Sequence, residues 1–244
     1  MRDYLIDIVK HIVPLGAFQT LRIDGSDDLT EISATQPGDK EIVVRGRMHA
    51  AIPEFKGLFG IPNLPQLNTI INIPEYQDEK AKFTVIRENK DGEQVPSFLH
   101  LENASGDFKN DFRLMASRII DGMEPKLTFK VKTWPVEFVP TAASQMRLKF
   151  QSQANPDEKV VTFTIDGGNI TAHLGSVAAH SGSFVFQTGV DASVKKSIPA
   201  PVHHINSVLA LTGDKTIHMG DLGMMITVDS GLATYDYIIP MLSK

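Results

Sequence analysis

The chain has 244 residues, of which 42% are hydrophobic and 22% are charged, and its formal net charge is −5. The hydrophobic content is enough for packed cores, and the length suits two domains of about 120 residues each. A net negative charge argues against a protein that coats nucleic acid over its whole surface, because binding phosphates requires Lys and Arg. It leaves open a protein whose positive charge is confined to one surface.

Membrane and disulfide classes are excluded next. The chain contains no cysteine, which rules out disulfide scaffolds and thiolate metal sites and is typical of a cytosolic protein. No apolar run approaches the roughly 20 residues that a membrane-spanning helix needs. The N-terminal apolar stretch contains Asp3 and Asp7, so it does not resemble a signal peptide. We expect a cytoplasmic protein that does not associate with membranes.

The first half begins with a predicted helix over residues 2–13. An alternating strand, Thr20–Gly25, follows and ends in Asp-Gly, which is a strong signal for a hairpin turn. After a strand near Ile42–Val44, a second helix is predicted over residues 52–60. The remaining strands expected in this half are Thr69–Ile73, Lys82–Ile86 and Ser97–Glu102.

The second half begins after a turn-rich stretch, Asp121–Pro125, which places a domain boundary near Gly122 and predicts domains over residues 1–121 and 122–244. A strand over Lys126–Lys132 precedes a helix over residues 139–153. In that helix an apolar stripe at i, i+4, i+7 and i+11 predicts the buried face; it consists of Val139, Ala143, Met146 and Phe150. A further helix over residues 200–211 should bury Val202, Ile205, Val208 and Leu209, and strands are expected at Thr162–Gly167, Phe184–Phe186, Thr216–Gly220 and Met224–Val228.

These elements repeat. Thr20–Gly25 (TLRIDG) matches Thr162–Gly167 (TFTIDG) at an offset of 162 − 20 = 142. Ile42–Val44 matches Phe184–Phe186 at 184 − 42 = 142, and Thr69–Ile73 matches Thr216–Gly220 at 216 − 69 = 147. Each half therefore reads as helix, strands, helix, strands, and we interpret the chain as an internal duplication. Ser97–Glu102 has no clear counterpart in the second half.

No enzyme signature is present. The chain lacks a phosphate loop of the GxxxxGK[ST] kind and an HExxH motif,. Asp229, Ser230 and Gly231 are turn formers between two strands, so we interpret them as a hairpin rather than a hydrolase segment. His203 and His204 are adjacent and should point about 100° apart on a helix. They are therefore interpreted as an exposed helical face, with contact to DNA as the functional alternative. We expect no catalytic residue, no cofactor and no metal site.

Several segments resemble the DNA polymerase sliding clamps of tailed phages, which are related in fold to the proliferating-cell clamps. The second half carries the fuller resemblance, in Phe129–Phe138 (FKVKTWPVEF), Ser144–Lys149 (SQMRLK), Val160–Ile170 (VVTFTIDGGNI) and Gly223–Pro240 (GMMITVDSGLATYDYIIP). In the first half, Phe55–Ile61 (FKGLFGI) is similar to the second helix of the phage clamps. The likeness is one of pattern over nearly the whole chain.

The resemblance implies an α+β fold, the DNA-clamp fold, with two similar domains that each pack two helices on antiparallel sheets. It further implies a non-enzymatic processivity factor in which three subunits close head-to-tail into a ring around duplex DNA. Its partners would be double-stranded DNA, bound without sequence preference, the replicative DNA polymerase and a clamp loader. Its location would be the host cytoplasm if the protein is viral. The alternative is a phage virion assembly protein with repeated β-rich domains.

Two sets of residues follow from this resemblance. The predicted helices carry Arg2, Lys10, Lys56, Arg147 and Lys149 against Asp3, Asp7 and Glu54, a net charge of 5 − 3 = +2. The residues expected to face DNA are Lys10, Lys56, Arg147, Lys149, Lys195 and Lys196, each of which could equally be an ordinary solvated charge. The residues expected to bind partner proteins are Met123, Pro240, Met241 and Leu242. For Met241 and Leu242 the alternative is that they finish a core strand.

Overall fold

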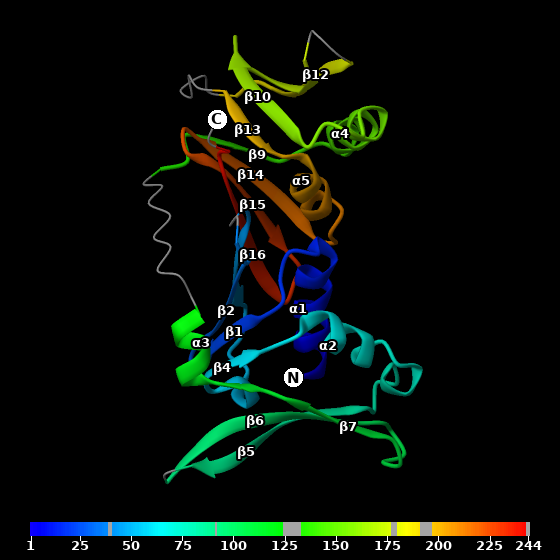
Figure 1. The fold of residues 1–244 in the computed structure, drawn as a ribbon, viewed down its shortest axis with the longest axis vertical. Coiled ribbons are helices and arrows are strands. Elements are labelled where there is room, and N and C mark those ends of the chain that lie inside the picture. The colour runs from blue at the N-terminus through cyan, green and yellow to red at the C-terminus, as the bar shows by residue number, and fades with distance from the viewer. Residues whose placement is uncertain (39–40, 91, 124–132, 177–179, 191–196, 243–244) are drawn as a thin grey trace. The chain divides into compact units, whose positions relative to one another are not determined.

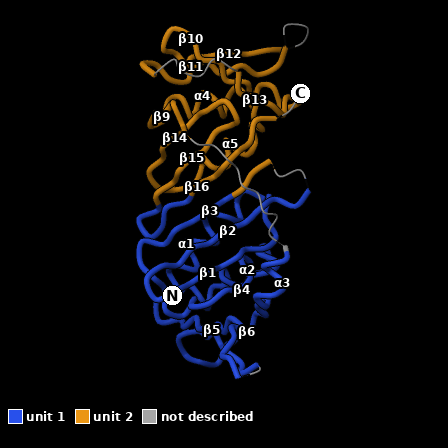
Figure 2. The backbone as a smooth tube through the Cα atoms, turned by 90° about the vertical axis from the view of Figure 1, so that its left-hand side faces the viewer, with its two compact units in different colours: residues 1–38, 44–127, 230–235 blue, residues 39–43, 128–229, 236–244 orange. Residues whose placement is uncertain are grey.

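The computed structural model describes residues 1–38, 41–90, 92–123, 133–176, 180–190 and 197–242. Contacts divide the chain into two units (Figure 2). Unit 1 consists of residues 1–38, 44–127 and 230–235, and unit 2 consists of residues 39–43, 128–229 and 236–244. The predicted strand over Lys126–Lys132 lies outside the described residues. None of the described helices is long and apolar enough to cross a membrane.

Unit 1 places two helices beside each other on its strands (Figure 1). Helix α1 (Arg2–Ile12) buries Leu5, Ile8, Val9 and Ile12, which recur at helical spacing along one face,. Helix α2 (Leu64–Ile71) begins at Asn63, whose side-chain oxygen accepts a hydrogen bond from the Gln66 amide. This cap satisfies one of the free amides at the helix start. Between these helices lie the 3₁₀ turns η1 (Val13–Leu15) and η2 (Pro53–Phe55), and η3 (Pro74–Tyr76) follows α2.

The strands of unit 1 form two antiparallel groups. One has the order β8-β4-β1-β2-β3 and the other β5-β6-β7. The bounds in the first group are β1 (Leu21–Gly25), β2 (Thr30–Thr35), β3 (Val43–Met48), β4 (Gly57–Ile61) and β8 (Met115–Ala116). Those in the second are β5 (Lys82–Lys90), β6 (Glu93–Glu102) and β7 (Lys109–Arg113). A third helix, α3 (Ser117–Met123), ends this part of the chain, and the predicted domain boundary at Gly122 falls within it.

Unit 2 repeats this order. Helices α4 (Ala142–Ala154) and α5 (Val202–Leu209) lie side by side (Figure 1) and are joined by a hydrogen bond of 2.8 Å from Asn206 to Ser152. The strand orders are β12-β11-β10-β13 and β16-β15-β14-β9. The bounds are β9 (Val136–Phe138), β10 (Val160–Asp166), β11 (Asn169–Gly175), β12 (Ser181–Thr188), β13 (Ile198–Pro201), β14 (Asp214–Gly220), β15 (Gly223–Asp229) and β16 (Ala233–Pro240).

The two units share their pairing pattern. In each, a helix leads into four strands, then a second helix, then a further set of strands, which is β5–β8 in unit 1 and β14–β16 in unit 2. Strand β1 pairs with β2 and β4, as β10 pairs with β11 and β13. The connection between β10 and β11 is a two-residue turn of Gly167 and Gly168, both at positive φ, which is the conformation that tight hairpins require,. The predicted α+β fold, with helix pairs on antiparallel sheets, is confirmed.

Two element assignments in the first half are wrong. Residues 52–60, predicted as a helix, form η2 and strand β4, because Gly57 takes a φ of +98° and ends the helical turn. Thr69–Ile73, predicted as a strand, lies largely in α2, which buries Leu64, Leu67 and Ile71. Consequently β5 and β6 are the counterparts of β14 and β15, and Ser97–Glu102, within β6, is not an extra strand.

The predicted buried face of the helix over residues 139–153 is also wrong. In α4 the buried side chains are Ser144 and Leu148. Met146 and Phe150 are 52% and 56% exposed, and Val139 and Ala143 are exposed as well. Ser144 tolerates burial because its hydroxyl donates to the Thr141 carbonyl. By contrast, the four residues predicted to be buried by the last helix, Val202, Ile205, Val208 and Leu209, are all buried in α5.

A largely buried carboxylate holds helix α1 to residues 230–235 within unit 1. Asp7 accepts hydrogen bonds of 2.7 Å from the Tyr235 hydroxyl and 2.9 Å from the Ser230 hydroxyl. His11 Nδ1 lies 3.3 Å from an Asp7 carboxylate oxygen, and its ring stacks on Tyr235 with centroids 4.7 Å apart. Burial raises the pKa of Asp7, but the hydrogen bonds from His11, Tyr235 and Ser230 outweigh it and lower the pKa below its usual value.

We predict that Asp7→Asn lowers the free energy of unfolding of unit 1 by about 1–3 kcal/mol at neutral pH, because the part-buried hydrogen bonds from Tyr235 and Ser230 lose a charged acceptor,. A carboxylate with a lowered folded pKa stabilises the fold above its unfolded pKa of about 3.9, and this stabilisation disappears as pH falls through the folded pKa. Urea unfolding at pH 7 and at pH 3 measures both effects. The variant should lose less stability on acidification than the wild type.

Asp3→Asn is the matched control, since Asp3 lies on the same helix with a largely exposed side chain. It should change stability at either pH by no more than a few tenths of a kcal/mol. Equal effects of the two substitutions would contradict a special role for Asp7.

Candidate functional site

The exposed face of α4 carries positive charge without a counter-charge. Arg147 and Lys149 are exposed, and residues 142–154 contain no Asp or Glu. At 100° per residue the two cations lie about 160° apart, on opposite flanks of the exposed face. Ser152, which bonds to α5, lies on the Lys149 flank. Gln151, whose side chain closely approaches Gly182 of β12, lies on the Arg147 flank. Lys149 therefore projects on the side of the helix pair and Arg147 on the side of the sheet edge.

The other residues expected to face DNA are differently placed. Lys10 is exposed in the last turn of α1. Lys56 is exposed but follows η2 instead of lying on a helix, and its ammonium pairs with Asp27 at 2.5 Å. Lys195 and Lys196 lie outside the described residues. Lys10, Arg147 and Lys149 therefore lie on helices, whereas Lys56 lies between η2 and strand β4.

The helices of the two units carry more positive than negative charge. Helices α1, α2, α4 and α5 contain four cations and two carboxylates, a balance of 4 − 2 = +2, in a chain of net charge −5. One of those carboxylates, Asp7, is largely buried. Arg2 is already engaged in hydrogen bonds within unit 1, because its guanidinium donates to the carbonyls of Tyr76 and Gln77. The described helical faces can therefore attract phosphates although the chain as a whole repels them.

An apolar patch lies on the outward face of α4. It consists of Met146 and Phe150, both exposed, and the exposed Val139 precedes the helix. Helix α4 packs against β12, the outer strand of its group, and Val185 of β12 is exposed too. The edge backbone of β12 and the patch together form a surface of the kind that protein partners cover.

The C-terminal residues lie against the turn between β14 and β15. The Met241 amide donates to the Leu222 carbonyl at 2.9 Å, and the Leu242 amide donates to the Pro199 carbonyl at 3.0 Å. Pro240, Met241 and Leu242 are half-buried, and Leu222 beside them is exposed. We call Leu222, Met241 and Leu242 the tail patch. It is an anchored apolar surface that can accept an apolar side chain. Met123, the fourth expected partner residue, is the last residue of α3.

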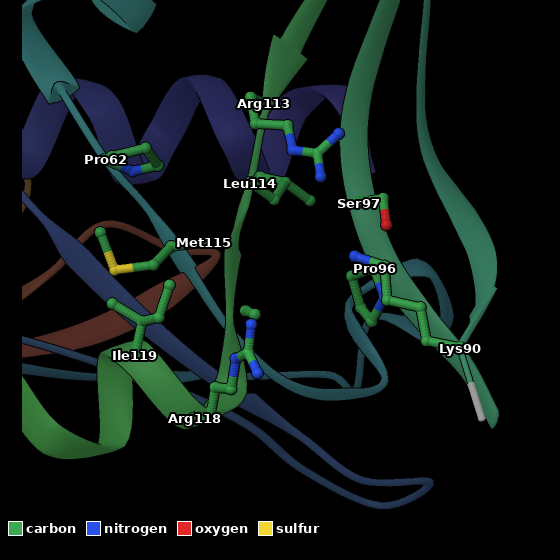
Figure 3. Close-up of a pocket in the computed structure, with 10 residues that line it drawn as sticks. Pro62, Lys90, Pro96, Ser97, Arg113, Leu114, Met115, Arg118 and Ile119 are labelled. Carbon is green, nitrogen blue, oxygen red and sulfur yellow. The ribbon is translucent and has the colours of Figure 1, made fainter.

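A pocket of about 360 Å³ in unit 1 was not predicted from the sequence (Figure 3). Its lining combines three cations with apolar side chains, namely Lys90, Arg113 and Arg118 with Pro62, Pro96, Leu114, Met115 and Ile119. Arg113 stacks over Phe98 at 4.5 Å, and Lys90 lies 3.7 Å from Glu88. The pocket can accept an apolar group that carries a negative charge. Its residues come from β5, β6, β7, β8, α3 and the residue after β4, so no regular spacing along the sequence indicated it.

A histidine cluster lies at the start of α5. The ring centroids of His203 and His204 are 3.8 Å apart, and Glu41 approaches with a carboxylate oxygen 3.5 Å from His204 Nε2. His204 is only 2% exposed, and neither ring nitrogen has a hydrogen-bond partner among the described residues. Burial lowers the pKa of His204 to about 4, and electrostatic repulsion from the neighbouring His203 contributes to this lowering. The expectation that the adjacent histidines form an exposed face therefore holds for His203 and is wrong for His204.

No protein-family model and no curated protein sequence matches the chain. Solved structures, by contrast, match the chain. The chain is similar to the PCNA of A. fulgidus, solved with the C-terminal region of FEN-1, at a TM-score of 0.67 and 14% identity, covering 100% of this chain and 97% of that one. It is also similar to PCNA from Thermococcus kodakaraensis, at a TM-score of 0.65 and 13% identity, covering 98% and 96%. The chain therefore has, over its whole length, the fold of the sliding clamps.

Proposed function

We propose that this protein is a phage sliding clamp, a homotrimeric ring that encircles duplex DNA and tethers the replicative polymerase. The observation that carries the proposal is the likeness to PCNA over the whole chain. The recurring order of elements supports two related domains, over residues 1–121 and 122–244. On this proposal the protein works in the host cytoplasm and is placed on DNA by a clamp loader.

The DNA surface of the ring would be the exposed faces of the helices. Lys10, Arg147 and Lys149 are exposed there, and α4 contains no carboxylate to offset its two cations. A small number of long cationic side chains suits a protein that must move along DNA, because contacts to phosphates position a protein without reading the bases. Lys56, Lys195 and Lys196 would add charge from neighbouring segments. Lys149, on the flank towards α5, should contribute most.

Reversing both α4 cations, in the double substitution R147E and K149E, tests this surface. The change is −4 per subunit and −12 per trimer, placed where phosphates would pass. We expect at least tenfold weaker binding to a linear duplex at low salt, measured by fluorescence anisotropy. The dependence of log affinity on log salt should become shallower by about 0.9 for each lost phosphate contact.

The control is the pair K80E and K82E, which imposes the same change in charge before and at the start of β5. It should leave the affinity and its salt dependence nearly unchanged. Unaltered binding by the α4 variant would show that this helix does not face DNA.

Ring closure would use the edge of β12 and the patch on α4. The other outer strand of that group, β13, contains Pro199 and Pro201, and the Pro199 carbonyl already accepts the Leu242 amide. In the three-stranded group of unit 1, β5 lies beside η2, where Arg87 donates to the Lys56 and Glu54 carbonyls. The outer strand on the opposite side of this group is β7, which is therefore the candidate for the joint. Pairing β12 with β7 of the next copy gives a head-to-tail joint, which closes into a ring when the rotation per copy allows it.

Phe150→Asp should separate the subunits. A buried Phe contributes about 1.5–3 kcal/mol through its apolar area, and a charge at the joint adds a desolvation cost. Wild-type protein should sediment near the trimer mass of 3 × 26.8, about 80 kDa, and the variant should sediment as a monomer at micromolar concentration. Ile86→Asp changes an exposed apolar residue of β5 and should leave the trimer intact. A monomeric wild-type protein would contradict the ring itself.

Partner proteins would dock on the tail patch. The A. fulgidus PCNA was solved with the C-terminal region of FEN-1, so that peptide is a suitable probe for this clamp. Met241 and Leu242 are held by backbone hydrogen bonds while their side chains remain partly exposed. Such a rigid, half-exposed apolar surface needs little ordering on binding.

Changing Met241 and Leu242 to Ser should weaken binding of a FEN-1 C-terminal peptide by tenfold or more, measured by fluorescence anisotropy. The reason is the lost burial of two apolar side chains. Ile119→Ser, in the pocket of unit 1, is the matched control and tells the two surfaces apart. A peptide that binds the tail variant normally, or does not bind the wild type, would contradict this docking site.

A further inference from the structure

We propose that Glu41, His203 and His204 form a binding site for one divalent transition-metal ion, with Zn²⁺ as the best match. One candidate ligand atom from each of the three side chains lies within 4.8 Å of the others. Two imidazoles and one carboxylate are a common three-ligand set for zinc, which completes its coordination with water. The inference concerns unit 2 alone and does not depend on the proposed clamp function.

The spacing of two ligand atoms already suits such an ion. Zinc lies about 2.0–2.1 Å from nitrogen and oxygen ligands, so two ligands at a tetrahedral angle are separated by about 3.3 Å. His204 Nε2 and the nearer Glu41 oxygen are 3.5 Å apart. An ion can therefore be placed between them with little movement of either side chain.

The third ligand can reach the same point. His203 is exposed, and its ring centroid lies 3.8 Å from that of His204 with 42° between the ring planes. An exposed side chain can rotate at small cost, which allows His203 to bring a nitrogen onto the ion. Helical spacing alone places the two Cβ directions about 100° apart, but imidazole rotation lets the rings converge.

The buried ring of His204 is the independent sign that a ligand is missing. It is 2% exposed, and neither nitrogen has a hydrogen-bond partner among the described residues. Leaving such atoms unsatisfied in the interior is costly, so buried polar groups without partners need an explanation. A metal ion on Nε2 satisfies the ring's acceptor nitrogen, and the remaining N–H stays on Nδ1.

Metal binding would join two distant parts of the chain. Glu41 precedes β3, whereas His203 and His204 lie in the first turn of α5. The ion would hold the segment before β3 to this helix and would stabilise unit 2 by binding the folded state only. It would also place two positive charges beside α5.

The test uses the full chain after treatment with a chelator, titrated with Zn²⁺ by calorimetry, and with Co²⁺ to follow the visible absorption of a four-coordinate ion. We expect one ion per chain with micromolar affinity, and a rise in the thermal unfolding midpoint on adding Zn²⁺. His203→Ala and Glu41→Gln should each weaken binding tenfold or more and reduce the rise. Neither substitution removes buried apolar volume, so both variants should fold.

His100→Ala is the matched control. Its two ring nitrogens lie near different carboxylates, Nδ1 at 2.6 Å from Asp111 and Nε2 at 3.7 Å from Glu102. Opposite sides of one ring cannot hold a single ion, so this variant should bind zinc like the wild type. The proposal is overturned if the wild type binds no zinc, or if the His203 and Glu41 variants bind it with unchanged affinity.

Discussion

Each unit depends on one physical constraint: two short helices must bury one face each against antiparallel strands. In unit 2 this face comes from α5, which buries four apolar residues, and from Leu148 and Ser144 of α4. The Asn206–Ser152 hydrogen bond then fixes the two helices side by side. In unit 1, α1 is held in the same way by apolar burial and by the Asp7 network. The outer faces of the helices are left to face water or a ligand, and they carry the uncompensated cations.

For the proposed clamp, this division explains how an acidic chain could bind a polyanion such as DNA. Phosphate attraction depends on local charge, and the field of a surface falls away within about 10 Å at 0.1 M salt. The helices hold a balance of 4 − 2 = +2 within a chain of −5, so the excess negative charge belongs to strands and loops. A weak positive field suits a clamp better than a strong one, since tight phosphate binding would oppose sliding.

The sequence predicted the fold where local chemistry decides structure. The hairpin at Gly167 and Gly168 follows from turn chemistry, and α5 from its apolar spacing. Prediction from the sequence failed where β-branched residues lie in a helix, as in α2, or where glycines break a helical pattern, as in β4. The His204–Glu41 approach and the pocket of unit 1 join segments far apart in the chain, and spacing along a sequence cannot report such contacts.

The error over α4 has a different cause, and it bears on function. Sequence periodicity identifies an apolar stripe correctly but cannot say whether the chain's own core or another molecule covers it. Here the core contains Leu148 and the hydrogen-bonded Ser144 of α4. The side chains of Met146 and Phe150 point outward, on the helix that packs against the edge strand β12. Exposed apolar side chains next to unpaired backbone groups would promote aggregation in a monomer. In the proposed ring, this stripe would continue the core across the joint with the neighbouring copy, and α4 would face DNA with one flank and close the ring with the other.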